Sequence, residues 1–146
     1  MQLFYMIAAS LIGMAFAAQP GINAVAAKTL GSALPATVLS VGITLIASAL
    51  IMFCGRTTPS WDMVMSLPIW IVLGGLIGVL VVAGGATIVP VTGAAIFFVC
   101  LISGQLLGSV LLDQMGAFGL QVKEISTYRI IGILLTFAGV FFVRYG

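Results

Sequence analysis

The stretch Gln19-Pro20-Gly21-Ile22-Asn23-Ala24 interrupts the first long apolar run of the sequence. It places two amide side chains four residues apart, with a proline and a glycine between them. If the run is a membrane helix, both amides lie in or near hydrocarbon, where an unsatisfied polar group costs several kcal/mol. Polar side chains kept at that depth are candidates for function. The stretch therefore predicts a membrane helix broken at Pro20 and Gly21, with the remaining chain as an apolar scaffold around it.

The composition predicts an integral membrane protein. Of the 146 residues, 62% are hydrophobic and only 5% are charged. A soluble domain carries about 25% charged residues, so this chain could not cover a water-facing surface. The net charge of +2 is too small and its residues are too scattered to indicate nucleic-acid binding.

Apolar runs and turn residues divide the chain into five expected membrane spans within a single domain. A spanning helix needs about 20 mostly apolar residues. The uncharged stretch from Leu67 to Leu112 is too long for one helix, so we expect a turn at Gly84-Gly85 and Pro90. The prediction is an all-α membrane protein over residues 1–146, with spans at about 3–30, 35–54, 68–84, 89–112 and 127–144.

The distribution of cations leaves the orientation open. An odd number of spans puts the termini on opposite sides, with Arg56, Lys123 and Arg129 on one side and Lys28 and Arg144 on the other. Orientation follows a clear excess of Lys and Arg, and here the difference is close to none. A fixed cytoplasmic N-terminus and insertion in both orientations are both compatible with these charges.

Small residues mark expected helix-packing faces. Helices in lipid pack by close approach, so glycines four apart indicate contact surfaces. Gly104 and Gly108 form a strict GxxxG pattern, and Gly74, Gly75 and Gly78 repeat the signal in the third span. The alternative is that glycine is simply common in membrane helices.

Gln19 and Asn23 are the strongest candidates for a binding site. A spacing of four residues puts both amides on one helix face, while Lys28 points away and should extend to the interface. Amides bind by hydrogen bonding and carry no protons. The structural alternative is an interhelical hydrogen bond of about 0.6–2 kcal/mol. Broken helices at membrane depth, however, are where transporters expose polar groups to substrate.

Two further side chains could line the same cavity. Gln105 lies midway along the fourth span, where a binding role and helix contact are equally compatible with the sequence. Trp70 lies near an end of the third span, as interfacial anchors do, and it could instead line a pocket. Asp113 is expected to be a helix cap facing water.

The sequence contains no recognisable enzyme, cofactor or metal site. It has no histidine, no paired carboxylates and no phosphate-binding loop, and a serine nucleophile would lack a base. Cys54 and Cys100 both lie in apolar runs, so we interpret them as small core residues.

In the order of its motifs, the chain resembles the YdcZ-like proteins, the small five-helix bacterial branch of the drug/metabolite transporter superfamily. The resemblance covers nearly the whole chain through Gln19 and Asn23, Pro35, Trp70 with Gly74, Gly75 and Gly78, Pro90 with Gly93, Gly104-Gln105, Asp113 with Gly116, and Arg129 with Gly132 and Gly139. It implies an inner-membrane half-transporter, because related ten-helix members contain two inverted five-helix repeats. An antiparallel homodimer, or a pair with a paralogous five-helix chain, would rebuild the transporter.

The functional hypothesis is transport of a small polar or zwitterionic metabolite by alternating access. The expected cavity is lined by Gln19, Asn23, Gln105 and Trp70. The more distant small multidrug resistance proteins exchange protons for cationic drugs with a glutamate in the first helix, but this chain has no acidic residue before Asp62. The alternatives are a multidrug or cation exporter and a non-transporting accessory subunit of another membrane complex.

Overall fold

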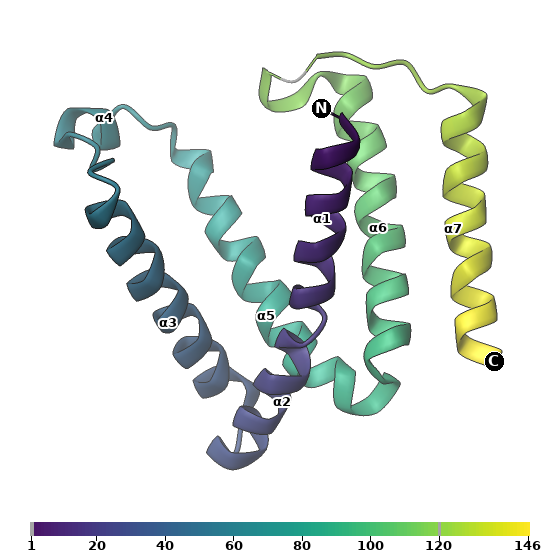
Figure 1. Ribbon diagram of the computed structural model, residues 1–146, viewed down its shortest axis with the longest axis horizontal. Helices are drawn as coiled ribbons and strands as arrows, with labels where there is room; N and C mark the ends of the chain where they lie inside the picture. The colour runs from purple at the N-terminus through teal and green to yellow at the C-terminus, as the bar shows by residue number, and fades with distance from the viewer. Residues whose placement is uncertain (1, 120) are drawn as a thin grey trace. The chain divides into compact units, whose positions relative to one another are not determined.

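The structure, a computed structural model, describes residues 2–119 and 121–146. Within them every regular element is helical (Figure 1). The elements in chain order are α1 (Gln2–Phe16), α2 (Gln19–Leu30), α3 (Ala33–Cys54), α4 (Trp61–Met65), η1 (Ile69–Ile71), α5 (Val72–Thr92), α6 (Ala94–Met115), η2 (Ala117–Gly119) and α7 (Thr127–Tyr145).

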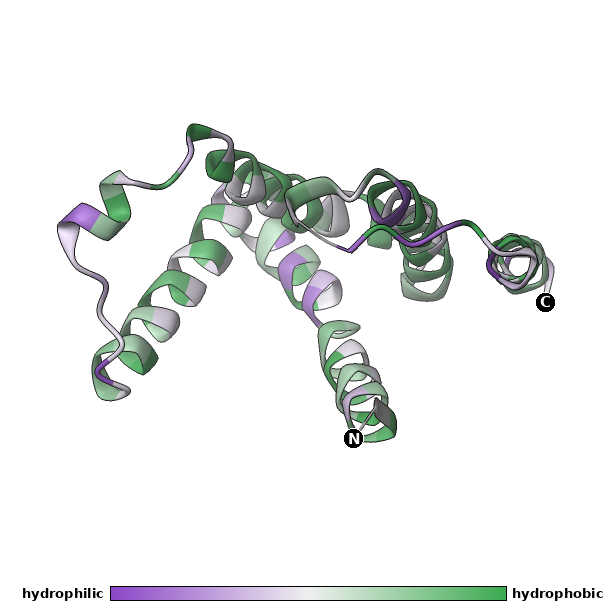
Figure 2. Ribbon diagram, turned by 90° about the horizontal axis from the view of Figure 1, so that it is seen from above, coloured by the Kyte–Doolittle hydropathy of each residue, from purple (hydrophilic) through white to green (hydrophobic). Residues whose placement is uncertain are grey.

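Five helical segments are long and apolar enough to cross a membrane. They are Leu3–Leu30, Ala33–Cys54, Ile69–Thr92, Ala94–Met115 and Thr127–Tyr145. Figure 2 shows mostly apolar or intermediate residues along these helices, with polar residues gathered near the α1–α2 junction and in the connecting segments. A helix that is apolar all round belongs in a membrane or a large core. The predicted all-α membrane protein with five spans is confirmed.

The break in the first span lies just before the amide-containing stretch. Helix α1 ends at Phe16, and the Ala18 N–H donates to the Ala15 carbonyl at 3.3 Å instead of continuing the α-helical pattern. Pro20 then occupies the first turn of α2, where a missing N–H removes no internal helix bond. The predicted break at Pro20 and Gly21 is therefore corrected to Ala17-Ala18, because a proline interrupts a helix on its N-terminal side.

The turn between the third and fourth spans lies later than predicted. Helix α5 runs through Gly84-Gly85 and past Pro90 to Thr92, so the expected turn there is wrong. An irregular backbone in hydrocarbon leaves polar groups unsatisfied, and this favours a continuous helix through a glycine pair. The chain turns at Gly93 (φ 81°, ψ 156°), a conformation that is essentially restricted to glycine.

The chain divides into two compact units, Met1–Val91 and Thr92–Gly146. In the first unit α2 packs against α3, and in the second α6 packs against α7. The α2–α3 pair is set by a tight connection, in which Gly31 adopts a left-handed conformation and Ser32 caps α3 through its Oγ and the Leu34 N–H. The single-domain organisation stays a prediction.

An ion pair joins the two helices of the second unit. Arg129 Nη2 lies 3.2 Å from Asp113 Oδ2, and the two side chains are 30% and 28% exposed. The Asp113 carbonyl also accepts a hydrogen bond from the Lys123 N–H at 3.0 Å. The sequence predicts a water-facing cap at Asp113. Its carboxylate instead pairs with Arg129 and joins the last turn of α6 to the start of α7.

We expect Asp113→Asn to lower the thermal unfolding temperature of the detergent-solubilised protein. The change leaves the Arg129 guanidinium, whose Nη1 is already buried without a hydrogen-bond partner, with no counter-charge. Partly exposed pairs contribute up to about 1 kcal/mol, so a shift of a few degrees is expected. Asp62→Asn is the matched control, because Asp62 forms no ion pair within the described residues. Equal shifts for both variants would show that the pair adds nothing.

Candidate functional site

Asn23 is a buried amide with an unsatisfied hydrogen-bond donor. Only 5% of its surface is exposed, and its Nδ2 has no partner in the described chain. Buried polar side chains nearly always have a partner, and leaving a donor unpaired costs about 1–3 kcal/mol. The unpaired donor makes Asn23 the strongest candidate for contact with a group from outside the chain, such as a bound molecule, a water or a second polypeptide.

The amide lies on a groove of about 290 Å³ in the first unit, at the lower end of the size of small-molecule sites. Helix α3 forms one wall, and α2 with the end of α1 forms the other. The groove is lined by Ala15, Ala18, Gln19, Ile22, Asn23, Ala26, Ala36, Leu39, Ser40, Ile43 and Thr44. Gln19 is half-buried and faces the same groove as Asn23, as their spacing predicted. The structure therefore brings the two predicted amides together.

Hydroxyl groups of α3 form the opposite polar wall of this groove. The Thr44 Oγ1 donates to the Ser40 carbonyl at 3.0 Å, so its proton is already used and its oxygen remains an acceptor. Our prediction from the sequence missed Ser40 and Thr44. A sequence pattern could have identified them, because Ser40, Thr44 and Ser48 repeat every four residues along one face of the second span. The groove thus combines amide donors with hydroxyl acceptors.

A second groove of about 370 Å³ meets the first at Gln19 and Thr44. Its remaining lining is Phe16, Val41, Gly75, Gly78, Val79, Val81 and Val82. A Cβ atom added at Gly75 or Gly78 would meet nothing within 4 Å. These two glycines therefore leave open space beside Gln19 and bring no other helix into contact there.

The other predicted site and packing residues are placed differently. Trp70 is 49% exposed on η1 and is not among the residues that line the two grooves holding Gln19. Gln105 is exposed on α6 in the second unit, so its place in a shared cavity stays a prediction. Gly74, Gly104 and Gly108 have no atom of their own unit near the Cβ position, so they do not pack these helices closely within a unit.

The described residues contain no cluster of histidine, cysteine or acidic side chains that could hold a metal ion. Cys54 and Cys100 are free and exposed in the chain, which corrects our interpretation of them as core residues. The error follows from the fold, since few side chains of any kind are buried within one chain.

Five apolar spans, and a polar groove at the helix break of the first unit, are the features of a multi-pass membrane protein of the transporter class. Residues 4–142 match a family described as "Putative inner membrane exporter, YdcZ". The chain therefore belongs to the YdcZ family of the drug/metabolite transporters, a multi-pass protein of the inner membrane, as its motifs predicted. The family points to a transporter and not to an enzyme. No curated protein and no solved structure matches the chain.

Proposed function

We propose that the protein is a half-transporter that exports a small polar or zwitterionic metabolite by alternating access as an antiparallel dimer. The observation that carries the proposal is the unpaired, buried Nδ2 of Asn23 on a groove at the helix break. A substrate that carries a hydrogen-bond acceptor would satisfy this donor during its passage. The exporter class is that of the family.

The chemistry of the groove favours a neutral or zwitterionic substrate over a bare cation. Its polar side chains are amides and hydroxyls, which offer both donors and acceptors but no fixed negative charge. The described spans of the first unit contain no acidic residue that could compensate a cationic drug or exchange a proton for it. Gln19 and Asn23 therefore recognise the substrate without taking part in proton transfer.

The surface of the chain supports assembly with a second five-helix chain. The glycine faces at Gly74 and at Gly104 and Gly108 are open within their own units, so they are available for close approach by another helix. Because the cation tally is nearly balanced, two copies can insert in opposite orientations. Gln105 and Trp70 would complete the cavity in such a dimer.

Ligand binding to the purified protein tests the substrate class. We expect zwitterionic metabolites to raise the thermal unfolding temperature and the same compounds to be transported in proteoliposomes. Gln19→Leu should weaken this binding about two- to tenfold, because one neutral hydrogen bond contributes about 0.5–1.5 kcal/mol. Lys123→Gln, in the polar segment before α7, is the control and should bind normally. Stabilisation by organic cations alone would contradict the proposal.

Topology reporters test the antiparallel arrangement. A C-terminal reporter that is active only in the cytoplasm and one that is active only in the periplasm should both give signal from the same chain. Adding two lysines at the C-terminus should move the signal toward the cytoplasmic reporter, because positive charges set orientation. Signal on a single face from the unaltered chain would exclude the antiparallel homodimer.

A further inference from the structure

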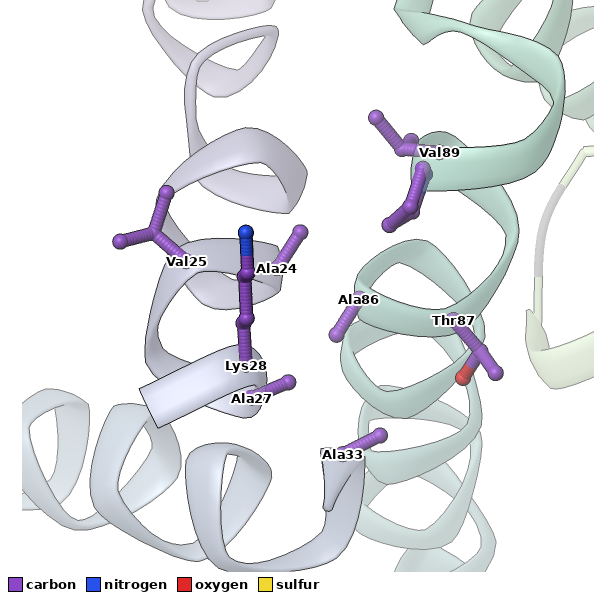
Figure 3. A pocket seen from close by; sticks show the side chains of 9 residues that line it. Ala24, Val25, Ala27, Lys28, Ala33, Ala86, Thr87 and Val89 are labelled. Atoms are coloured by element: carbon purple, nitrogen blue, oxygen red, sulfur yellow. The ribbon is translucent and has the colours of Figure 1, made fainter. Parts of the chain in front are cut away.

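A separate groove in the first unit holds a lysine among small apolar residues. It has a volume of about 510 Å³ and lies between α2 and α5 (Figure 3). Gln19 and Asn23 are not among its lining residues. The residues that line it are Ala24, Val25, Ala27, Lys28, Ala33, Ala86, Thr87, Val89 and Pro90. Lys28 is the charged member of this set.

The Lys28 side chain runs back along its helix rather than out past its end. Figure 3 shows its ammonium nitrogen at the level of Ala24, one turn closer to the middle of the span. Side chains on a helix lean toward its N-terminus, which for Lys28 is the direction of the membrane interior. This differs from the extension to the interface that the sequence suggested. The Lys28 side chain is exposed, so it places a positive charge on the open side of an apolar groove.

No acidic group of the first unit can neutralise this charge. The acidic residue described there is Asp62, which follows the far end of α3. Ala33 and Cys54 are about 30 Å apart along that helix, since each residue rises 1.5 Å. Lys28 forms no ion pair within the described residues. The ammonium group is therefore free to pair with an anion from outside the chain.

The lengths of the spans favour a position of the groove near the lipid headgroups. The span Leu3–Leu30 has 28 residues and is about 42 Å long as a helix, whereas the hydrocarbon core is about 30 Å thick. The excess of about 12 Å allows the last turns of α2 to extend into the interfacial region. Pro90 lies in the last turn of the span Ile69–Thr92, so both walls of the groove reach the end of a span.

The apolar walls of the groove can pack against an acyl chain, and the lysine can bind a phosphate. Ala24, Ala27, Ala33 and Ala86 form a smooth apolar surface with room between the helices. The Thr87 hydroxyl donates to the Ala83 carbonyl, so its proton is already used. The Lys28 ammonium provides three donors and a full charge, and basic pockets between membrane helices bind anionic headgroups.

We propose that this groove binds one anionic phospholipid, with its phosphate on Lys28 Nζ and an acyl chain against the alanine walls. The proposal is independent of the substrate groove, because the two share no lining residue. A phospholipid fits better than a soluble anion because the groove is apolar apart from Lys28 and Thr87 and reaches the ends of two spans, where lipid phosphates are concentrated.

Native mass spectrometry of the full chain, released from nanodiscs of equal parts phosphatidylglycerol and phosphatidylcholine, tests this site. The unaltered protein should retain a phosphatidylglycerol adduct in preference to phosphatidylcholine. Lys28→Gln should lose that preference several-fold, and Lys28→Arg should keep it. Arg144→Gln removes another cation near the end of a span, outside the groove, and should keep the preference.

A second variant distinguishes lipid binding in the groove from charge attraction between the protein and anionic lipid. Ala24→Leu leaves every charge in place but fills the groove, so it should also weaken phosphatidylglycerol retention. Equal losses for Lys28→Gln and Arg144→Gln, or full retention by Ala24→Leu, would overturn the proposal. Displacement of the lipid by dilute octyl phosphate would also overturn it, because the site would then take soluble amphiphiles.

Discussion

Asn23→Leu should strongly weaken substrate binding while leaving the protein at least as stable as before. The Asn23 Nδ2 is buried and unpaired, so replacing the amide with an apolar side chain of similar size removes an unfavourable group. The same change leaves an acceptor of the bound substrate without its donor. That loss costs about 1–3 kcal/mol, or about 5- to 150-fold in affinity.

Thr37→Val provides the matched control for this experiment. Thr37 is also buried, but its hydroxyl donates to the Ala33 carbonyl at 2.9 Å and does not line the substrate groove. This variant should bind substrate normally. Ligand binding is measured by thermal shift, and the unfolding temperature of the free protein is measured alongside it. A lowered unfolding temperature together with loss of the dimer in Asn23→Leu would instead identify Asn23 as a contact between subunits.

Gly78→Leu should reduce transport more than tenfold without destabilising the chain. A leucine side chain would project into the groove of about 370 Å³ beside Gln19 and occupy space that the substrate needs. The chain should tolerate it, because nothing lies within 4 Å of the Cβ position. Replacing a helical glycine also gains up to about 1 kcal/mol of helix propensity. Proteoliposome flux and the unfolding temperature measure the two effects.

Gly74→Leu distinguishes a blocked groove from a blocked subunit interface. Gly74 lies on the same helix, is equally open, and does not line the groove. We expect Gly74→Leu to reduce transport only to the extent that it reduces dimer formation. Cross-linking in the membrane measures the fraction of dimer. If Gly74→Leu and Gly78→Leu lost transport equally and both remained dimeric, the groove beside Gln19 would not be the substrate path.

The five spans could be predicted because they depend on the length of the apolar runs, which can be read directly from the sequence. Each span is an apolar run long enough to cross hydrocarbon, and polar segments separate most of them. The turn after the third span was misplaced because Gly84-Gly85 and Pro90 are turn signals in water. Gly93 carried no stronger signal than its neighbours, although its backbone conformation ends the helix.

The sequence predicted the amide wall of the candidate site, formed by the first span, but not the hydroxyl wall formed by α3. Gln19 and Asn23 stand out because amides are expensive in hydrocarbon and few other strongly polar residues share their span. Ser40 and Thr44 did not stand out, because hydroxyls can bond to their own helix at little cost. The Asp113–Arg129 pair and the inward direction of Lys28 depend on helix geometry that the order of residues does not reveal.

Few side chains are buried within the chain, so its stability depends on the surrounding membrane more than the stability of a soluble domain depends on its solvent. The apolar side chains buried in the described chain are those of Pro20, Ala36, Ala86, Phe97 and Val110, whereas large apolar residues along every span are exposed. Within each unit, most of the apolar surface is therefore left for the surroundings to cover. If the proposed second subunit covers part of it, the stability of the fold depends on subunit concentration. Raising the lipid-to-protein ratio should therefore lower the stability of the fold. For this protein, that ratio would have the effect that denaturant concentration has for a soluble domain.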